Sequence, residues 1–233
     1  MASTRNSLAC AACPVRDRAA CSALDEDQRE ELERAGRMVQ LKRGETLFHA
    51  GDDARACATL ITGALKISSI DGDGTEHILS LVHPAGFVGE LFAPVAHHDV
   101  TAITDSRLCV FPADAYGRIV DRFPALGKAL LRRSSEDLFA SRMLVDLMGR
   151  RSAREKVAGF ILAMADAAST SPCHPTDRLE LPLTRGEIAG MLGLTIETIS
   201  RQLTRLERDG VIERDGARGI RLIDAARLAS LAG

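Results

Sequence analysis

The stretch LTRGEIAGMLGLTIETISRQLTRLERDG at positions 183–210 constrains the fold more than any other part of the chain. Thr184, followed three residues later by Glu187, has the pattern of a capping box and predicts a helix start. Gly193 suits the left-handed conformation that ends a helix, and Thr195 is a favourable N-cap for the next one. The stretch therefore predicts two short helices joined by a tight turn.

The second of these helices is predicted to be amphipathic. Four apolar residues at helical spacing are expected to face inward: Ile196, Ile199, Leu203 and Leu206. The opposite face carries polar side chains: Glu197, Ser200, Arg201, Thr204 and Arg208.

Glu197, Ser200 and Arg201 lie at i, i+3 and i+4 near the start of this helix. A helix-turn-helix reads DNA with that region of its second helix. Arg pairs bidentately with guanine, Glu accepts from cytosine, and Ser contacts several bases. The alternative is an ordinary solvated helix face, which is the commoner source of charged residues. The predicted DNA-contacting residues are Glu197, Ser200, Arg201, Thr195, Thr204 and Arg208.

The residues after the second helix argue against the interpretation that its polar face is an ordinary solvated surface. Residues 211–214 and 220–223 are apolar-rich runs separated by a turn that contains Gly216 and Gly219, which predicts a β-hairpin. A helix, a turn, a helix and then a hairpin make a winged DNA-binding module. We therefore expect double-stranded DNA as a partner.

Length and composition fit such a protein without proving it. The chain has 233 residues, enough for two domains with separate cores. It has no apolar run of membrane-spanning length and no signal-peptide pattern at its start, so a cytoplasmic protein is expected. The net charge is only −2, so DNA affinity must come from a local basic patch. No paired carboxylate motif, phosphate loop or nucleophile–base signature is found, and no enzymatic activity is expected.

The six cysteines are the second informative feature. A cytoplasmic chain is not expected to use them in disulfides. Cys10, Cys13 and Cys21 crowd into a segment that is poor in core-forming residues, with the spacing C-x2-C-x7-C. Spacing alone leaves four possibilities open: zinc, an iron–sulfur cluster, a redox pair at Cys10 and Cys13, or a reactive tail without a structural role.

Between these segments the periodicity changes twice. Residues 24–35 predict a short polar helix, and residues 38–112 alternate short apolar runs with Gly-rich turns. Such a pattern predicts a compact antiparallel barrel or roll, which either encloses a small ligand or serves as a scaffold. A helix is expected from near Ala113 to just before Pro124.

Residues 125–148 predict a long helix that ends at the Gly149–Arg151 segment. Leu131, Leu138 and Val145 recur every seven residues, with Ser134, Ser141 and Met148 on the adjoining seam. This pattern favours a coiled coil in a homodimer, because winged modules usually read paired half-sites. The alternative is a long helix packed on its own domain. The predicted dimerisation residues are Leu131, Leu138, Val145 and Met148.

The remaining C-terminal residues complete the predicted DNA-binding domain. Ser152 and Glu155 have the pattern of a second capping box. The helix that follows is expected to bury Val157, Phe160, Ile161 and Met164. Residues 169–177 are expected to form a loop.

These features together resemble the Crp–Fnr superfamily of bacterial transcription regulators. The similarity covers about residues 41–233 and is sharpest at 41–52, 86–91 and 193–212. It implies an α+β fold, with an N-terminal cyclic-nucleotide-binding-like β-roll, a long dimerisation helix and a C-terminal winged helix-turn-helix. The expected segments are a cysteine segment with its lead-in helix at 1–36, a β-roll sensor domain at 37–123, the dimerisation helix at 124–149 and the DNA-binding domain at 150–233.

The E-x-x-S-R pattern of Glu197, Ser200 and Arg201 is similar to that of the Fnr (fumarate and nitrate reduction regulator) branch. That resemblance implies a TTGAT-type half-site in DNA. It also implies a [4Fe–4S] cluster held by Cys10, Cys13, Cys21 and Cys109, with the cysteine spacing of alphaproteobacterial members. By the same pattern Cys57 and Cys173 are not ligands. Cys57 lies in an apolar strand and is expected in the core, and Cys173 lies in a Pro-flanked loop and is expected to be exposed.

The resemblance further implies a mechanism and its alternatives. Oxygen would degrade the cluster, loosen the dimer and lower the affinity for DNA. Glu136, Asp137 and Asp146 would repel across the dimer and favour the monomer. Loops of the roll, including residues 92–99, would contact RNA polymerase. Sensing of nitric oxide or redox state remains an alternative, as does a zinc-stabilised regulator that senses nothing.

Cyclic AMP is not expected as a ligand. Members that bind cyclic nucleotides follow the GEL motif of residues 89–91 with an Arg-Ser pair that grips the phosphate, whereas residues 94–101 contain no arginine. His97 and His98 are expected in an exposed loop. Haem ligation by His77 is not expected, because no cysteine partner lies nearby.

Overall fold

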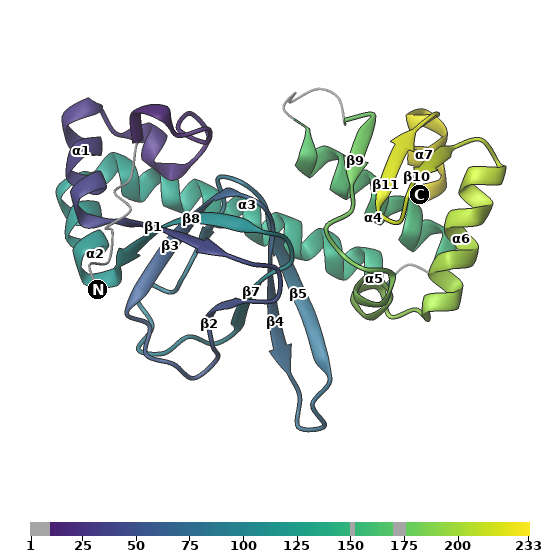
Figure 1. Cartoon of the computed structure of the whole chain (residues 1–233), viewed down its shortest axis with the longest axis horizontal. Helices are drawn as coiled ribbons and strands as arrows, with labels where there is room; N and C mark the ends of the chain where they lie inside the picture. Colours follow the sequence, from purple (N-terminus) through teal and green to yellow (C-terminus); the bar gives the residue numbers. More distant parts are fainter. Residues whose placement is uncertain (1–9, 150–151, 170–175) are drawn as a thin grey trace. The chain divides into compact units, whose positions relative to one another are not determined.

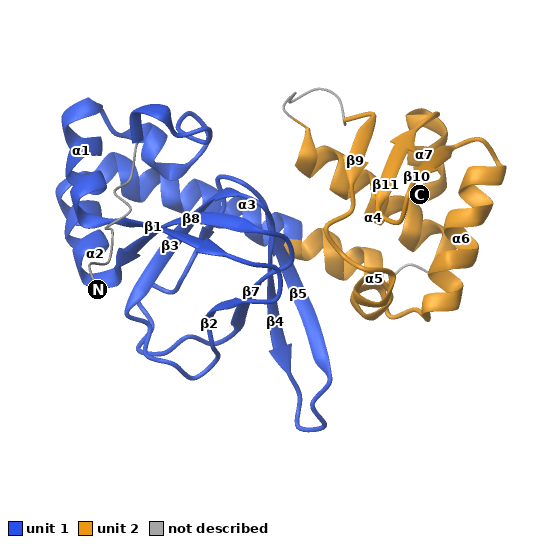
Figure 2. Ribbon diagram, in the orientation of Figure 1, with its two compact units in different colours: residues 1–140 blue, residues 141–233 orange. Residues whose placement is uncertain are grey.

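The computed structural model describes residues 10–149, 152–169 and 176–233. It divides into two compact units, Met1–Ala140 and Ser141–Gly233, which are coloured separately in Figure 2. The boundary falls inside the long helix α3 (Pro124–Gly149). Within the described residues no helix combines the length and apolar character that a membrane span requires.

The first unit contains the expected antiparallel roll (Figure 1). It has two four-stranded sheets, in the orders β1-β8-β3-β6 and β2-β7-β4-β5. The strands are β1 (Arg37–Leu41), β2 (Thr46–Phe48), β3 (Ala56–Thr62), β4 (Leu65–Ile70), β5 (Glu76–Val82), β6 (Phe87–Val88), β7 (Asp99–Ala102) and β8 (Ser106–Pro112).

Strand β8 places alternate side chains in two different cores, because successive residues of a strand point to opposite faces. Leu108 and Val110 pack inside the roll with residues of both sheets. Cys109 and Phe111 point to the other face, where Cys109 is paired in register with Met38 of β1 and Thr59 of β3. Strand β8 thus presents the Cys109 side chain on the outer face of the sheet, away from the interior of the roll.

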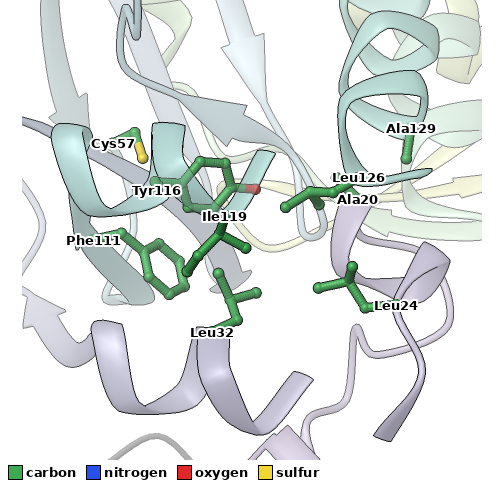
Figure 3. Packing of buried hydrophobic residues seen from close by; sticks show 9 residues of the cluster. All are labelled: Ala20, Leu24, Leu32, Cys57, Phe111, Tyr116, Ile119, Leu126 and Ala129. Carbon is green, nitrogen blue, oxygen red and sulfur yellow. The ribbon is translucent and has the colours of Figure 1, made fainter. Parts of the chain in front are cut away.

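The N-terminal segment and two helices cover this outer face (Figures 1 and 3). The segment contains the 3-10 turns η1 (Cys10–Ala12) and η2 (Ala20–Ala23). Helix α1 (Glu26–Ala35) begins at a capping box of Asp25 and Gln28, and helix α2 (Ala113–Arg122) ends before Pro124 as expected. The core beneath them contains Ala20, Leu24, Leu32, Cys57, Phe111, Tyr116, Ile119, Leu126 and Ala129.

Helix α3 is buried at its start and exposed along its middle. Leu126 and Ala129 belong to the core just described. Further along, the apolar side chains of Leu138, Phe139 and Val145 are 50–70 % exposed. Other residues of the described chain leave these apolar side chains uncovered. Contiguous exposed apolar residues of this kind mark interaction surfaces.

The second unit is a three-stranded sheet with four helices around it and the end of α3. Its elements are α4 (Ala153–Ala168), β9 (Arg178–Glu180), α5 (Arg185–Leu192), α6 (Ile196–Arg208), β10 (Ile212–Asp215), β11 (Gly219–Leu222) and α7 (Ala225–Ala232). The predicted hairpin is β10–β11, and α4 buries the four expected residues. Two elements were not predicted: β9, which adds a third strand beside β11, and the terminal helix α7.

A close helix contact explains one glycine of this unit. Gly159 of α4 faces Leu147 of α3, and a Cβ atom at Gly159 would lie 2.6 Å from the Leu147 Cδ1 atom. Any larger residue would displace Leu147, which is buried. Residues 150–151 and 170–175 lie outside the described residues. The expected helix break at 150–151, most of the expected 169–177 loop and the exposed position expected for Cys173 therefore have no structural counterpart here.

Candidate DNA-binding surface and cysteine pocket

Helices α5 and α6 form the predicted helix-turn-helix. The Thr184 hydroxyl accepts a hydrogen bond from the Glu187 N–H at 3.2 Å, and the Glu187 carboxylate accepts one from the Thr184 N–H at 2.7 Å. Gly193 ends α5 in the left-handed region, at φ +62°. Thr195 caps α6 by accepting from the Thr198 N–H at 3.2 Å. The prediction of two helices and a tight turn is confirmed, including its caps.

The buried face of α6 differs from the expected one at its first residue. Ile199, Leu203 and Leu206 are buried as predicted, but Ile196 is 52 % exposed. The fourth buried position is Gln202. Ile196 is the first residue of the helix, so the turn before it holds it away from the core, and the expectation that it faces inward is wrong.

The structure places the predicted DNA-contacting residues on the accessible side of α6. Glu197, Arg201 and Arg208 are exposed. The backbone N–H of Glu197 and the Thr195 hydroxyl hold the pKa of the Glu197 carboxyl below its usual value, so this carboxylate is ionised and able to accept hydrogen bonds. Within the described part of the chain, Arg201 has no hydrogen-bond or ion-pair partner, so its guanidinium is available to a ligand.

Two hydroxyls on this face already have partners. Arg185, at the start of α5, donates to the Ser200 hydroxyl at 3.3 Å. The Thr204 hydroxyl donates to the Ser200 carbonyl oxygen at 3.0 Å, within the helix. The sequence analysis did not single out Arg185. Arg185 directly follows the capping residue Thr184, and this place at the start of the first helix was the sequence signal that could have identified it as a neighbour of the second helix.

The cysteine residues come together in the other unit. Cys10, Cys13, Cys21 and Cys109 line one small cavity of about 20 Å³ beneath the N-terminal segment. Three of them come from residues 10–21, and the fourth is carried there by β8. Cys57 lies on the same outer face of the sheet and is fully buried, as predicted, but it does not line the cavity.

The protonation of the thiols reflects their burial. Burial, and then the Cys13, Cys10 and Cys21 thiols, together raise the pKa of the Cys109 thiol to about 12. Burial, and then Glu33, raise the pKa of Cys10 to about 11. Four thiolates would therefore not coexist here without a cation to compensate them.

Two arginines also line the cavity, and the sequence analysis did not identify either. Arg29 donates its Nε to the Cys21 carbonyl oxygen at 3.3 Å and its Nη2 to the Leu24 carbonyl oxygen. Arg16 lies on the same lining. Both guanidinium groups favour the thiolate form of Cys21, although burial still raises its pKa overall.

This donor set fits an iron–sulfur cluster chemically, because such clusters are held by four thiolates and carry net negative charge. As the side chains stand in the described residues, no three His, Cys, Asp or Glu groups are placed to hold a metal ion. A cavity of about 20 Å³ has room for about one water molecule. A cluster would therefore require the lining to move apart.

A second, larger cavity of about 220 Å³ lies between the roll and α3. Its lining includes the carboxyl groups of Asp52, Asp53 and Glu90. Arg133 of α3 also lines it, a cation that the sequence analysis overlooked by searching only residues 94–101. Arg133 is already paired with Glu136 at 3.1 Å and lies 3.9 Å from Asp137.

That pairing bears on one expectation about the dimerisation helix. Glu136 and Asp137 were predicted to repel across a dimer, and the single guanidinium group of Arg133 offsets part of their charge within the same helix. Their repulsion across a dimer stays a prediction. Asp146 also has an interaction partner. The predicted seam is exposed in the chain as described: Leu131, Leu138, Val145 and Met148 are 45–70 % exposed.

His97 and His98 were both expected in an exposed loop, but His98 is half-buried and lines the larger cavity. His97, in the loop after β6, is exposed, and its Nδ1 atom is hydrogen-bonded to Glu90. His77 is also exposed, and its Nε2 atom lies 3.0 Å from Asp71. Both residues have carboxylate partners, and neither lines either cavity.

A β-roll, a long helix and a winged helix-turn-helix define a DNA-binding transcription regulator. Residues 38–123 match the cyclic nucleotide-binding domain family, and residues 155–231 match the Crp-like helix-turn-helix domain family. The transcriptional activator protein FnrL of Cereibacter sphaeroides is 36 % identical, over 96 % of this chain and 92 % of that protein. The nitrogen fixation regulation protein FixK of Bradyrhizobium diazoefficiens is 34 % identical, over 96 % of this chain and 93 % of that protein.

Solved structures agree with this assignment. The structure of FixK2 from Bradyrhizobium japonicum superimposes with a TM-score of 0.77 and 25 % identity, covering 85 % of this chain and 98 % of that chain. The chain belongs to the Crp–Fnr family. Members of this family are transcription regulators rather than enzymes; they bind DNA and are typically dimers.

Proposed function

We propose that this regulator senses oxygen through a [4Fe–4S] cluster held by Cys10, Cys13, Cys21 and Cys109. The observation that carries the proposal is the convergence of these four cysteines on one cavity, although Cys109 is far from the others in sequence. Burial raises the pKa of the Cys109 and Cys10 thiols, so a cation would have to replace their protons for both to act as ligands.

The bound cluster would supply a group that reacts with oxygen. The chain's own residues do the rest. Arg29 fastens the Cys21 segment to α1 and, with Arg16, places positive charge beside an anionic site. Cys109 anchors the site to the sheet, so that occupancy of the pocket would link the N-terminal segment to β8.

A continuous core connects this pocket to the dimerisation helix. Cys10, Cys21 and Cys109 pack at the edge of the core in Figure 3, which also contains Leu126 and Ala129 of α3. Displacement of the N-terminal segment would therefore disturb the packing at the start of α3. A coupling of a few kcal/mol through such contacts is sufficient for a two-state switch.

Dimerisation would use the exposed seam of α3, with Leu131, Leu138 and Val145 at its centre. A dimer presents two copies of α6, and each would contact one half of a palindromic site. We infer a TTGAT-type half-site, with Ser200 and Arg201 at the distinguishing bases and Glu197 as a shared contact. Binding of both halves together multiplies the affinity relative to one half alone.

Two further features complete the proposal. The cavity between the roll and α3 does not suit a cyclic nucleotide, because the phosphate of the nucleotide would meet the carboxylates of Asp52, Asp53 and Glu90.

RNA polymerase is the proposed protein partner, and the loop of residues 92–99 is a candidate contact, since Phe92 is 93 % exposed. Nitric oxide is a second candidate signal, because four cysteine ligands do not discriminate between the two gases.

The test measures iron, sulfide and visible absorbance on the full-length protein purified without oxygen. Affinity for a TTGAT-type palindrome is then followed while air is admitted. We expect about four irons for each chain, a brown absorbance that bleaches in air, and a parallel fall in DNA affinity. Repeating the titration with nitric oxide in place of air separates the two signals. Zinc, or no metal, would refute the sensing proposal and leave the DNA-binding regulator.

A further inference from the structure

Tyr116 of α2 is the only tyrosine in a chain without tryptophan. It is 1 % exposed and lines the same cavity as the four cysteines. Neither the motif spacing nor the family resemblance assigns it a role. Its position nevertheless makes it the one phenol that a group bound in the pocket would meet.

The ring of Tyr116 packs against two other aromatic rings. Its centroid lies 5.5 Å from that of Phe87 and 5.2 Å from that of Phe111, with tilts of 38° and 52°. Such tilted aromatic pairs are favourable and fix the ring plane. In Figure 3 the hydroxyl end points toward the side where Leu126 and Ala20 lie.

Across the residues that the structure describes, no protein group is hydrogen-bonded to the hydroxyl at the end of this ring, and the residue lines the cavity. A buried phenol usually finds a hydrogen-bond partner. The cavity is the place where such a partner would be held. The ionisable groups that act on the phenol are the thiols of Cys57, Cys21 and Cys109. Two of these three are proposed ligands.

We propose that the Tyr116 hydroxyl donates a hydrogen bond to sulfur of the group bound by these cysteines, either a ligand sulfur or a cluster sulfide. This inference rests on the proposed cluster. Hydrogen bonds to sulfur stabilise the more negative, reduced state and raise the reduction potential of an iron–sulfur centre. Tyr116 thereby makes the bound cluster harder to oxidise and sets how fast it is lost in air.

A comparison of the metal-free and loaded proteins separates this role from a purely structural one. In the protein without metal, Tyr116→Phe keeps the ring and removes a hydroxyl that is bonded to no protein group among the described residues, so the unfolding midpoint should stay nearly the same. In the loaded protein the same substitution removes a hydrogen bond to the bound group. A structural role would move the stability of the metal-free protein and leave the potential unchanged.

The experiment compares wild type and Tyr116→Phe after anaerobic reconstitution with ferrous iron and sulfide. We expect equal iron content, a lower reduction potential and a several-fold faster loss of visible absorbance in air. The matched control is Thr101→Val, which removes a hydroxyl of the other sheet, 3.0 Å from that of Thr46. The control should match wild type in both potential and decay.

A second measurement does not depend on a substitution. Because Tyr116 is the only tyrosine, growth on 3-fluorotyrosine labels this position alone. The fluorinated phenol is a stronger donor, so the potential should shift in the direction opposite to that of Tyr116→Phe. Tyrosine fluorescence of unlabelled protein should fall on loading and return when the iron is chelated.

The outcomes distinguish the two proposals. If wild type loads iron but neither Tyr116→Phe nor the fluorinated protein shifts the potential or the decay rate, the role of Tyr116 is refuted and the cluster stands. If wild type loads no iron, both are refuted.

Discussion

The DNA-binding surface and the cysteine pocket are built in opposite ways. The surface comes from one continuous stretch, in which α5, the turn and α6 follow one another and are capped by their own residues. The pocket joins residues 10–21 to Cys109 across a β-sheet. Local hydrogen bonds specify the first site, whereas the second exists only after the roll has folded.

The two sites also differ in what they still need. Arg201 and Glu197 are exposed and charged, and are ready to contact a ligand from solvent. The Cys109 thiol is largely buried with a pKa raised to about 12, and such a group becomes a ligand only when a cation replaces its proton. Under the proposed function, the DNA-contacting side chains are already accessible in the free chain, whereas the pocket would be completed by the group that it binds.

The largest expected effect concerns the two cysteines on the outer face of the same sheet. Cys109→Ser should abolish the iron–sulfur absorbance, because one of four thiolate ligands is lost. Cys57→Ser is the matched control, since Cys57 is buried on that face but does not line the cavity. Iron and sulfide analysis after anaerobic purification measures both. Equal iron content in the two variants would contradict the ligand assignment.

The next effect tests the exposed helix that follows the pocket. Leu138→Glu places a charge in the α3 seam and should shift the protein from dimer to monomer. Affinity for a full palindrome should then fall on the order of 100-fold, since the halves no longer bind together. Ala140→Glu adds the same charge at an exposed position outside the seam. Sedimentation and DNA titration of both variants give the answer, and a dimeric Leu138→Glu protein would show that the seam lies elsewhere.

A smaller effect is expected at the DNA-binding surface. Arg201→Ala should weaken specific binding by about 1–3 kcal/mol and leave salt-dependent, non-specific binding nearly unchanged. Arg205→Ala removes an equal charge from the last turns of the same helix. Competition titrations against random DNA measure how strongly each of the two variants still prefers the specific site. Undiminished discrimination by the Arg201→Ala protein would mean that α6 reads DNA with other residues.

The smallest effect is a pH dependence that belongs to the unit with the pocket. Burial, and then the charge of Arg133, lower the pKa of His83 in the folded protein. The unfolded chain therefore binds more protons below pH ~6.5, and the free energy of unfolding should fall as the pH drops through that value. His83→Gln should flatten this part of the profile. Denaturant unfolding between pH 8 and 5.5 measures it, and an unchanged slope would show that another group is responsible.

The helix-turn-helix was predictable in detail because its signals are local. The Thr184–Glu187 box, Gly193 and Thr195 each act on backbone groups within a few residues. The one error, at Ile196, arose at a helix end, where periodicity no longer decides which way a side chain faces. Strand β9 was missed because its three residues are too short to show a period of two.

The N-terminal unit was predictable only in outline. Alternating apolar runs and glycine turns indicated a roll, but nothing in them told which face of β8 would carry Cys109. The membership of Cys109 in the site came from resemblance to a family rather than from its neighbours in sequence. Arg133 was overlooked for the same reason, since it reaches the roll's cavity from a helix.

The sequence by itself determined the capped helices, the wing, the heptad of α3 and the alternation of the strands. All of these depend on periodicity and on hydrogen bonds between near neighbours. The tertiary structure alone decided that Cys109, Arg29 and Tyr116 share one cavity with the N-terminal cysteines. The reason is that the composition of a cavity depends on which faces of distant elements meet, and that is settled by packing of the whole domain.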